Sequence, residues 1–162
     1  MVNEVCLNEA MLAGAAEVFE TMVFMDVRES LERDSVPAGN TLLGSITFTG
    51  DVEGCLGICC SVPCARAIAQ NMLGLTQTDE LSEADITDAI GEVANMVMGS
   101  VKSRIQERIG TLNVSIPTVV TGQALDTSIG DHASPTNRIV TRLNIADEHT
   151  AELSLQYRQK SE

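Results

Sequence analysis

Aromatic residues and positive charge are both scarce in this 162-residue chain. Aromatic side chains make up 2% of it and tryptophan is absent, so the core has to be built from aliphatic residues and methionine. Lysine and arginine number 10, against 23 aspartates and glutamates, which gives a formal net charge of −13. Because nucleic acids and anionic membrane surfaces are bound through basic residues, this balance argues against both as partners. A protein or a small molecule is the expected partner.

The chain also lacks the roughly 20 consecutive apolar residues that a membrane helix requires. Its first ten residues, MVNEVCLNEA, contain two acids and no base, which is not the pattern of a secretory signal peptide. We therefore expect a cytoplasmic protein without membrane insertion. Hydrophobic residues still make up 44%, and neither a repeat nor a domain boundary is visible, so residues 1–162 are expected to form a single domain.

Helical periodicity recurs in three segments that have start and stop signals. The first helix is expected to be capped by Asn8 and to end near Val23. The other two are expected from Ser61 and Pro63 to Gly74, and from Ser82 or Asp85 to Ile109 with a stop at Gly110.

The remaining segments are strand-like. Residues 41–50 and 54–62 flank a compact turn and predict a β-hairpin. Residues 26–39 indicate a loop with a short strand, whereas further strands are expected at 112–122 (interrupted by Pro117), 138–146 and 150–158. Because neighbouring strands are joined by short turns, the sequence predicts an α+β fold: an antiparallel sheet of about five to six strands packed on about three helices.

The third helix has two unlike faces. At 100° per residue, Asp88, Glu92, Asn95, Gly99 and Lys102 form a narrow stripe opposite a broad apolar face. A lone Glu92 would be an ordinary solvated charge. Asn95, however, is unfavourable in mid-helix, and glycines such as Gly99 cost about 1 kcal/mol each relative to alanine. Unfavourable residues gathered near one stripe indicate a face that accommodates another molecule.

The spacing Asp88-x3-Glu92-x2-Asn95 is similar to the (Asp or Ser)-x3-Glu-x2-Asn signature of the CheC/CheX/FliY family of chemotaxis phosphatases. The flanking GEVANMVMGSVKSRI, the run GSITFTGDVEGCLGICC and the segment IAQNMLG resemble the family's helix, hairpin and second helix. The likeness extends from about Asn8 to Tyr157. CheC types carry a second signature on the first helix; here Glu17 is present, but Glu20 stands where asparagine is required. The chain therefore most resembles the single-site CheX type, which forms homodimers.

This resemblance implies hydrolysis of the aspartyl phosphate of a CheY-like response regulator. Asn95 would orient the attacking water, and Glu92 would pair with the regulator's active-site lysine. Asp88, Gly99 and Lys102 are expected in the partner-binding surface, and Met96 and Met98 at its edge. No cofactor or metal of its own is expected, because Mg²⁺ would be held by the regulator.

Two alternatives stay open. The same helix could dock a receiver domain without turnover, as a non-catalytic binding module. Alternatively, Cys55, Cys59, Cys60 and Cys64 could bind a metal or sense redox state. Their spacing contains no C-x2-C pair, and cysteine in an apolar run behaves as a small hydrophobe, which favours packing over ligation.

Overall fold

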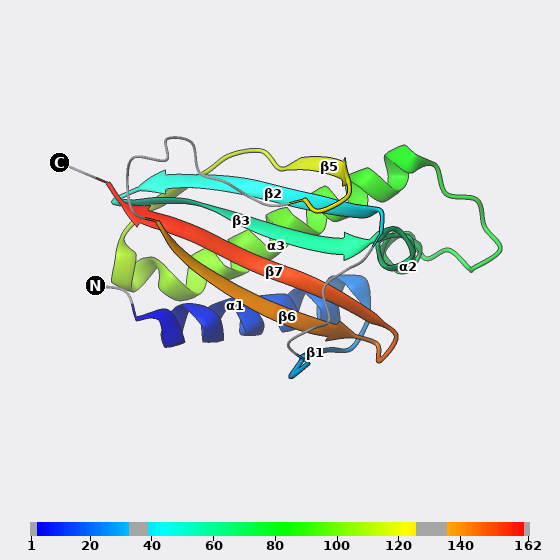
Figure 1. The fold of residues 1–162 in the computed structure, drawn as a ribbon, viewed down its shortest axis with the longest axis horizontal. Coiled ribbons are helices and arrows are strands. Elements are labelled where there is room, and N and C mark those ends of the chain that lie inside the picture. Colours follow the sequence, from blue (N-terminus) through cyan, green and yellow to red (C-terminus); the bar gives the residue numbers. More distant parts are fainter. Residues whose placement is uncertain (1–2, 33–38, 126–135, 161–162) are drawn as a thin grey trace.

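A computed structural model describes residues 3–32, 39–125 and 136–160. Within these ranges the chain forms an antiparallel seven-stranded sheet in the order β1-β6-β7-β3-β2-β4, with β5 also paired to β2. Strands β3, β7 and β6 lie in front of helices α1 and α3 in Figure 1, so the helices cover one face of the sheet. The predicted α+β class, with helices on one face of an antiparallel sheet, is confirmed. The elements are α1 (Glu4–Val18), a π-helical turn η1 (Phe19–Val23), β1 (Val27–Glu29), β2 (Thr41–Gly50), β3 (Val52–Ser61), α2 (Val62–Leu73), α3 (Glu83–Ile109), β4 (Leu112–Val114), β5 (Thr118–Gly122), β6 (Asn137–Ile145) and β7 (His149–Gln159).

Local capping chemistry sets the ends of α2 and α3, as predicted. The Ser61 side chain accepts a hydrogen bond from the Cys64 N–H, and Gly74 ends α2 in the left-handed conformation at φ 66°. At α3, Ser82 and Asp85 form a reciprocal capping box, and Gly110 is the C-cap.

The predicted cap of the first helix was wrong. Helix α1 begins at Glu4, because the Asn3 side chain accepts a hydrogen bond from the Val5 N–H at 3.0 Å. Asn8 lies inside the helix, and its side-chain oxygen accepts a hydrogen bond from the Thr141 hydroxyl on β6. The asparagine therefore joins the helix to the sheet.

The sheet has one strand more than the five to six predicted. The β2–β3 hairpin is present, with Phe48 paired to Gly54 next to the turn, and β1 is the expected short strand. The additional strand arises because Pro117 divides the 112–122 run into β4 and β5. Both pieces pair with β2, β4 near its C-terminal end and β5 near its N-terminal end.

Close backbone approach fixes α3 against both the sheet and α1. A Cβ on Gly44 of β2 would lie 3.0 Å from Ile90 Cγ2, and one on Gly14 of α1 would lie 3.1 Å from Val101 Cγ2. Glycine at both positions lets α3 lie close enough to bury its apolar face. Five residues of that face are fully inaccessible to solvent: Ile90, Val93, Ala94, Val97 and Val101. No helix in the described ranges is both long and apolar enough to cross a membrane.

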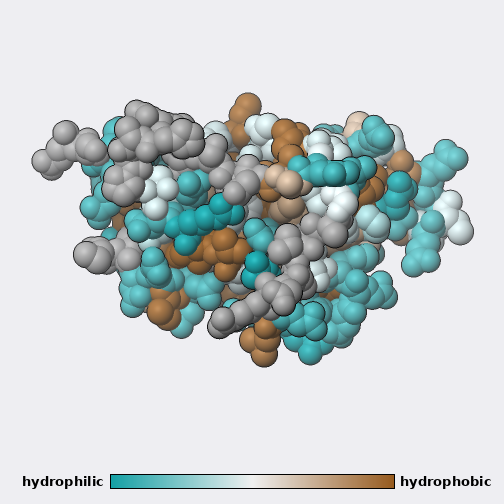
Figure 2. All heavy atoms as spheres, in the orientation of Figure 1, coloured by the Kyte–Doolittle hydropathy of each residue, from teal (hydrophilic) through white to brown (hydrophobic). Residues whose placement is uncertain are grey.

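The opposite face of the sheet presents mostly polar side chains. Figure 2, in the same orientation, shows hydrophilic residues with several separate hydrophobic areas between them. Arg158 pairs with Glu53 across β7 and β3 at 2.5 Å, and Arg142 lies 3.9 Å from Glu152 across β6 and β7. These cross-strand pairs stabilise a solvent-facing sheet surface, whereas the apolar core lies between the sheet and the helices.

Candidate functional site

The structure brings the predicted site residues together on one exposed stripe of α3. Asp88, Glu92, Asn95 and Gly99 are exposed and Lys102 is half-buried, on the side of the helix turned away from the sheet. Among the described residues, none of the four polar side chains has a hydrogen bond or ion pair. Successive members are three or four residues apart, which places neighbouring side chains about 5–6 Å from one another. The stripe is therefore available to a second molecule.

The two glycines near the stripe differ in their surroundings. A Cβ on Gly99 would meet nothing within 4 Å, so packing within the described chain does not require glycine there. A Cβ on Gly91, which is buried, would lie 3.4 Å from Val119 Cγ2 and 3.8 Å from Pro117 Cγ, distances of ordinary van der Waals contact. Neither glycine is demanded by a steric clash.

Met96 and Met98 were both predicted to border the stripe, but only one of them does. Met98 is fully buried in the core, so it cannot contact a partner. Met96 is half-buried and packs against the edge of the core. The prediction is therefore wrong for Met98, and Met96 alone retains an accessible side.

On the α1 side of the stripe, Glu17 is held in an ion-pair cluster. Its Oε2 accepts hydrogen bonds from Arg104 Nη2 at 2.7 Å and from the Ser100 hydroxyl at 2.9 Å. The Arg104 hydrogen bond is the main cause that lowers the pKa of Glu17, followed by that of Ser100. Glu20, where the CheC-type signature has asparagine, is exposed. Glu17, the acidic residue of the incomplete second signature, is thus paired with Arg104 and Ser100 of the same chain.

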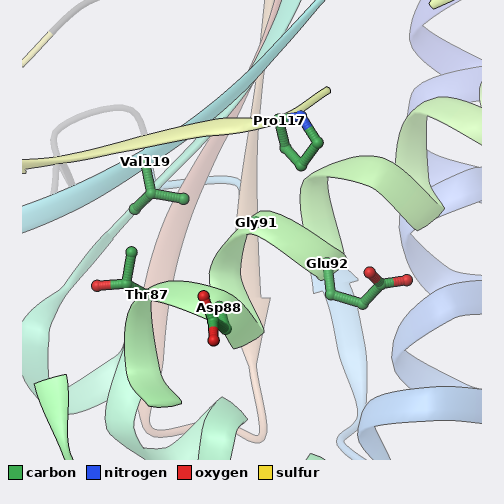
Figure 3. A pocket seen from close by; sticks show the side chains of 6 residues that line it. All are labelled: Thr87, Asp88, Gly91, Glu92, Pro117 and Val119. Carbon is green, nitrogen blue, oxygen red and sulfur yellow. The ribbon is translucent and has the colours of Figure 1, made fainter. Parts of the chain in front are cut away.

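On the other side of the stripe lies a shallow pocket of about 330 Å³ that the sequence did not reveal. Figure 3 shows it between α3 and the segment that enters β5, and its lining residues are Thr87, Asp88, Gly91, Glu92, Pro117 and Val119. In this view the Glu92 carboxylate points away from Val119. The one sequence signal for this pocket was Pro117. It indicated an interruption of the strand, but it did not indicate that the proline lies above α3.

The cysteines are free thiols and are mostly buried. Cys55, Cys60 and Cys64 belong to the interior, whereas Cys6 and Cys59 are partly accessible. A hydrogen bond with Cys64, followed by burial, raises the pKa of the Cys60 thiol well above its ordinary value. Protonated, buried thiols are poor nucleophiles and poor metal ligands. Among the described residues, no group of three His, Cys, Asp or Glu side chains is arranged to hold a metal ion.

The chemistry available on the stripe is limited. It offers one carboxamide, two carboxylates and an ammonium group, and these five residues include no histidine, cysteine or hydroxyl nucleophile. A carboxamide both donates and accepts hydrogen bonds, which suits it to hold a water molecule. The fold and the stripe thus define an α+β protein that presents an exposed Glu–Asn pair on α3.

Comparison with known proteins agrees with this description. The model of the family "Chemotaxis phosphatase CheX" matches residues 42–136, more than half of the chain. The chain belongs to the CheX family of chemotaxis phosphatases. A curated relative, the CheY-P phosphatase CheX of Thermotoga maritima, is 30% identical over 86 residues, which are 53% of this chain and 55% of the relative. The match thus spans about half the length of that relative.

Solved structures share the fold over almost the whole chain. The crystal structure of the chemotaxis protein CheX from Vibrio vulnificus is similar with a TM-score of 0.75 and 24% identity, covering 98% of this chain and 100% of that one. The CheX–CheY–BeF₃–Mg²⁺ complex from Borrelia burgdorferi gives a TM-score of 0.70 at 14% identity, with 98% of this chain and 100% of that one covered. At these identities the likeness establishes the fold.

Proposed function

We propose that this protein hydrolyses the aspartyl phosphate of a CheY-like response regulator. Asn95 positions the attacking water, and Glu92 pairs with the regulator's active-site lysine. The observation that carries the proposal is the Glu92–Asn95 pair, exposed on α3 and without a partner among the described residues. Membership of the CheX family supports it, as does the fold shared with a CheX whose structure is a complex with CheY.

The proposed reaction needs little from this chain. An acyl phosphate already has a good leaving group, so hydrolysis is accelerated chiefly by placing water in line with the phosphorus and neutralising the phosphoryl oxygens. The regulator supplies the lysine and the Mg²⁺ that neutralise those oxygens. The Asn95 carboxamide accepts a hydrogen bond from the water and donates one to an oxygen nearby, which orients the water's lone pair toward the phosphorus.

The rest of the stripe serves binding in this proposal. Glu92 lies one turn from Asn95, so its ion pair with the partner's lysine sets the register in which the amide enters the site. Asp88 and Lys102 extend the charged contact at either end, and Gly99 leaves space for the partner's backbone. We expect the protein to act in the cytoplasm as a homodimer. Sedimentation of the purified protein would test the oligomeric state.

A second candidate is a module that binds a receiver without turnover. The same stripe would serve, but binding alone does not call for a carboxamide in the middle of a helix, where asparagine is unfavourable. The presence of Asn95 beside Glu92 therefore favours hydrolysis over binding alone.

The deciding experiment measures phosphate release from the CheY-like receivers of the same genome, each phosphorylated with a small-molecule donor. We expect the protein to accelerate release from at least one receiver above that receiver's own rate. Binding to a beryllofluoride-activated receiver without acceleration would favour the module. If the protein neither binds any of these receivers nor accelerates their dephosphorylation, the proposal is contradicted.

A further inference from the structure

The pocket beside the stripe has one rigid apolar wall. Pro117 and Val119 face α3 across it, and the neighbouring Ile116 is 87% exposed. Both ends of this segment are fixed to β2. Ser115 donates its N–H to the Thr47 carbonyl at 2.9 Å, and its hydroxyl accepts from the Thr47 N–H at 3.0 Å, while β5 pairs with β2 from Thr118 onward. The wall is thus formed before any ligand arrives, which lowers the entropic cost of binding.

Gly91 forms the side of the pocket that belongs to α3. A Cβ there would project toward Val119 at a distance of 3.4 Å, which is ordinary contact. Alanine would therefore fit sterically and would favour the helix by about 1 kcal/mol. Val119 and Pro117 lie directly over Gly91, which is buried and forms the floor of the pocket.

The polar rim has one sign of charge. The six lining residues include two acids, Asp88 and Glu92, and no base, while Thr87 adds a hydroxyl. Figure 3 shows the Asp88 side chain on α3 below Gly91, between Thr87 and Glu92. Neither carboxylate has a counter-ion among the described residues. The apolar surface of Pro117 and Val119 beside the unpaired Asp88 carboxylate is complementary to a side chain with an aliphatic stem and a cationic end.

We propose that this pocket is a recognition subsite for a lysine side chain on the receiver partner, separate from the lysine that pairs with Glu92. The methylene stem lies along Pro117 and Val119, and the ammonium group reaches the Asp88 carboxylate. Asp88 thereby becomes a specificity-determining residue.

This inference rests on the proposed function but can fail independently of it. Asn95 and Glu92 act at the phosphoryl group, so losing them removes the rate enhancement. The pocket acts on binding alone, equally in the ground state and the transition state. Changes there are therefore expected to raise KM and leave kcat unaltered.

The main experiment measures dephosphorylation of a receiver that the wild-type protein accelerates. We expect Asp88→Asn to raise KM about 3- to 5-fold with kcat unchanged, an effect typical of a solvent-exposed ion pair, and we expect the increase to shrink in high salt. Glu107→Gln is the matched control, because it removes an exposed carboxylate from the same helix outside the pocket. An unchanged KM for Asp88→Asn, or an equal rise for Glu107→Gln, would overturn the proposal.

Replacing the receiver's surface lysines by glutamine one at a time should identify one lysine whose effect is lost in the Asp88→Asn background. If no receiver lysine is coupled to Asp88 in this way, the inference is contradicted.

A second probe does not depend on the receiver. The cation n-butylammonium mimics the lysine side chain, and n-butanol is its uncharged control. In an NMR titration, n-butylammonium should shift the amide signals of Thr87, Gly91 and Val119, and Asp88→Asn should remove the effect. If no receiver is accelerated, the proposed function fails while this titration still decides the pocket. Equal shifts with both probes would refute a cation subsite.

Discussion

Gly99→Ala is predicted to stabilise the folded protein while lowering its activity on the receiver. Residue 99 lies inside the 27-residue helix α3, it is exposed, and an added Cβ would meet nothing within 4 Å. The substitution therefore carries no steric cost within the described chain and gains the helix propensity of alanine, about 1 kcal/mol. For a chain of this size that gain corresponds to a rise in melting temperature of about 2–4 °C.

The same methyl group is expected to obstruct the partner. If the receiver's backbone packs against Gly99, an inserted methyl costs about 1–3 kcal/mol of complex stability, as overpacking does in a core. A loss of 1 kcal/mol corresponds to roughly a fivefold drop in kcat/KM for the phosphorylated receiver. Stability and activity should thus move in opposite directions, which general structural damage would not produce.

Urea unfolding followed by circular dichroism gives the stability, and phosphate release gives kcat/KM. Gly14→Ala is the matched control. Its added Cβ would lie 3.1 Å from Val101 Cγ2, and this crowding should cancel the gain in stability from helix propensity. A destabilised Gly99→Ala would refute the exposed position assigned to residue 99. A stabilised variant with unchanged kcat/KM would remove Gly99 from the partner-binding surface.

Three further predictions concern the surroundings of the stripe. Glu92→Lys should lower kcat/KM by more than tenfold at low ionic strength and by less at high salt, because it places like charges together; a salt-independent loss would argue against the ion pair. Glu17→Gln should lower the free energy of unfolding at neutral pH. The folded-state pKa of Glu17 is lowered, so its contribution to stability is fully present above its ordinary pKa of 4.5 and disappears as the pH falls through the folded-state pKa; a pH-independent difference in urea titrations would contradict the Arg104 pairing. Met98→Ala should cost about 2–5 kcal/mol of stability and Met96→Ala clearly less, since Met98 alone is fully buried; equal costs in urea unfolding would show that their burial is misassigned.

Local signals in the sequence were sufficient for the hairpin and for two of the three helices. The Ser82–Asp85 box, Gly74 and Gly110 act within one turn of themselves, so their effect is visible in the sequence. Asn8 misled because it has the chemistry of a cap but forms its bond to Thr141, a residue 133 positions away. Asn3, nearer the terminus, supplies the actual cap.

The stripe itself could be predicted because it depends on helical spacing alone. Its surroundings could not. The bond between Glu17 and Arg104 joins residues 87 positions apart, and the packing of Pro117 and Val119 over Gly91 depends on how β4 and β5 follow β2. Met98 shows the limit of a spacing argument, because a residue at the border of two faces is placed by packing.

The most direct test of the proposed phosphatase is the rate of phosphate release with Asn95→Ala. The account predicts a loss of about 100-fold in kcat, as expected when a reacting water is no longer positioned, together with retained binding to the beryllofluoride-activated receiver. Asn113→Ala, which removes an exposed amide from β4 instead, should behave like the wild type. Equal rates of phosphate release from Asn95→Ala and the wild-type protein would contradict the role assigned to Asn95.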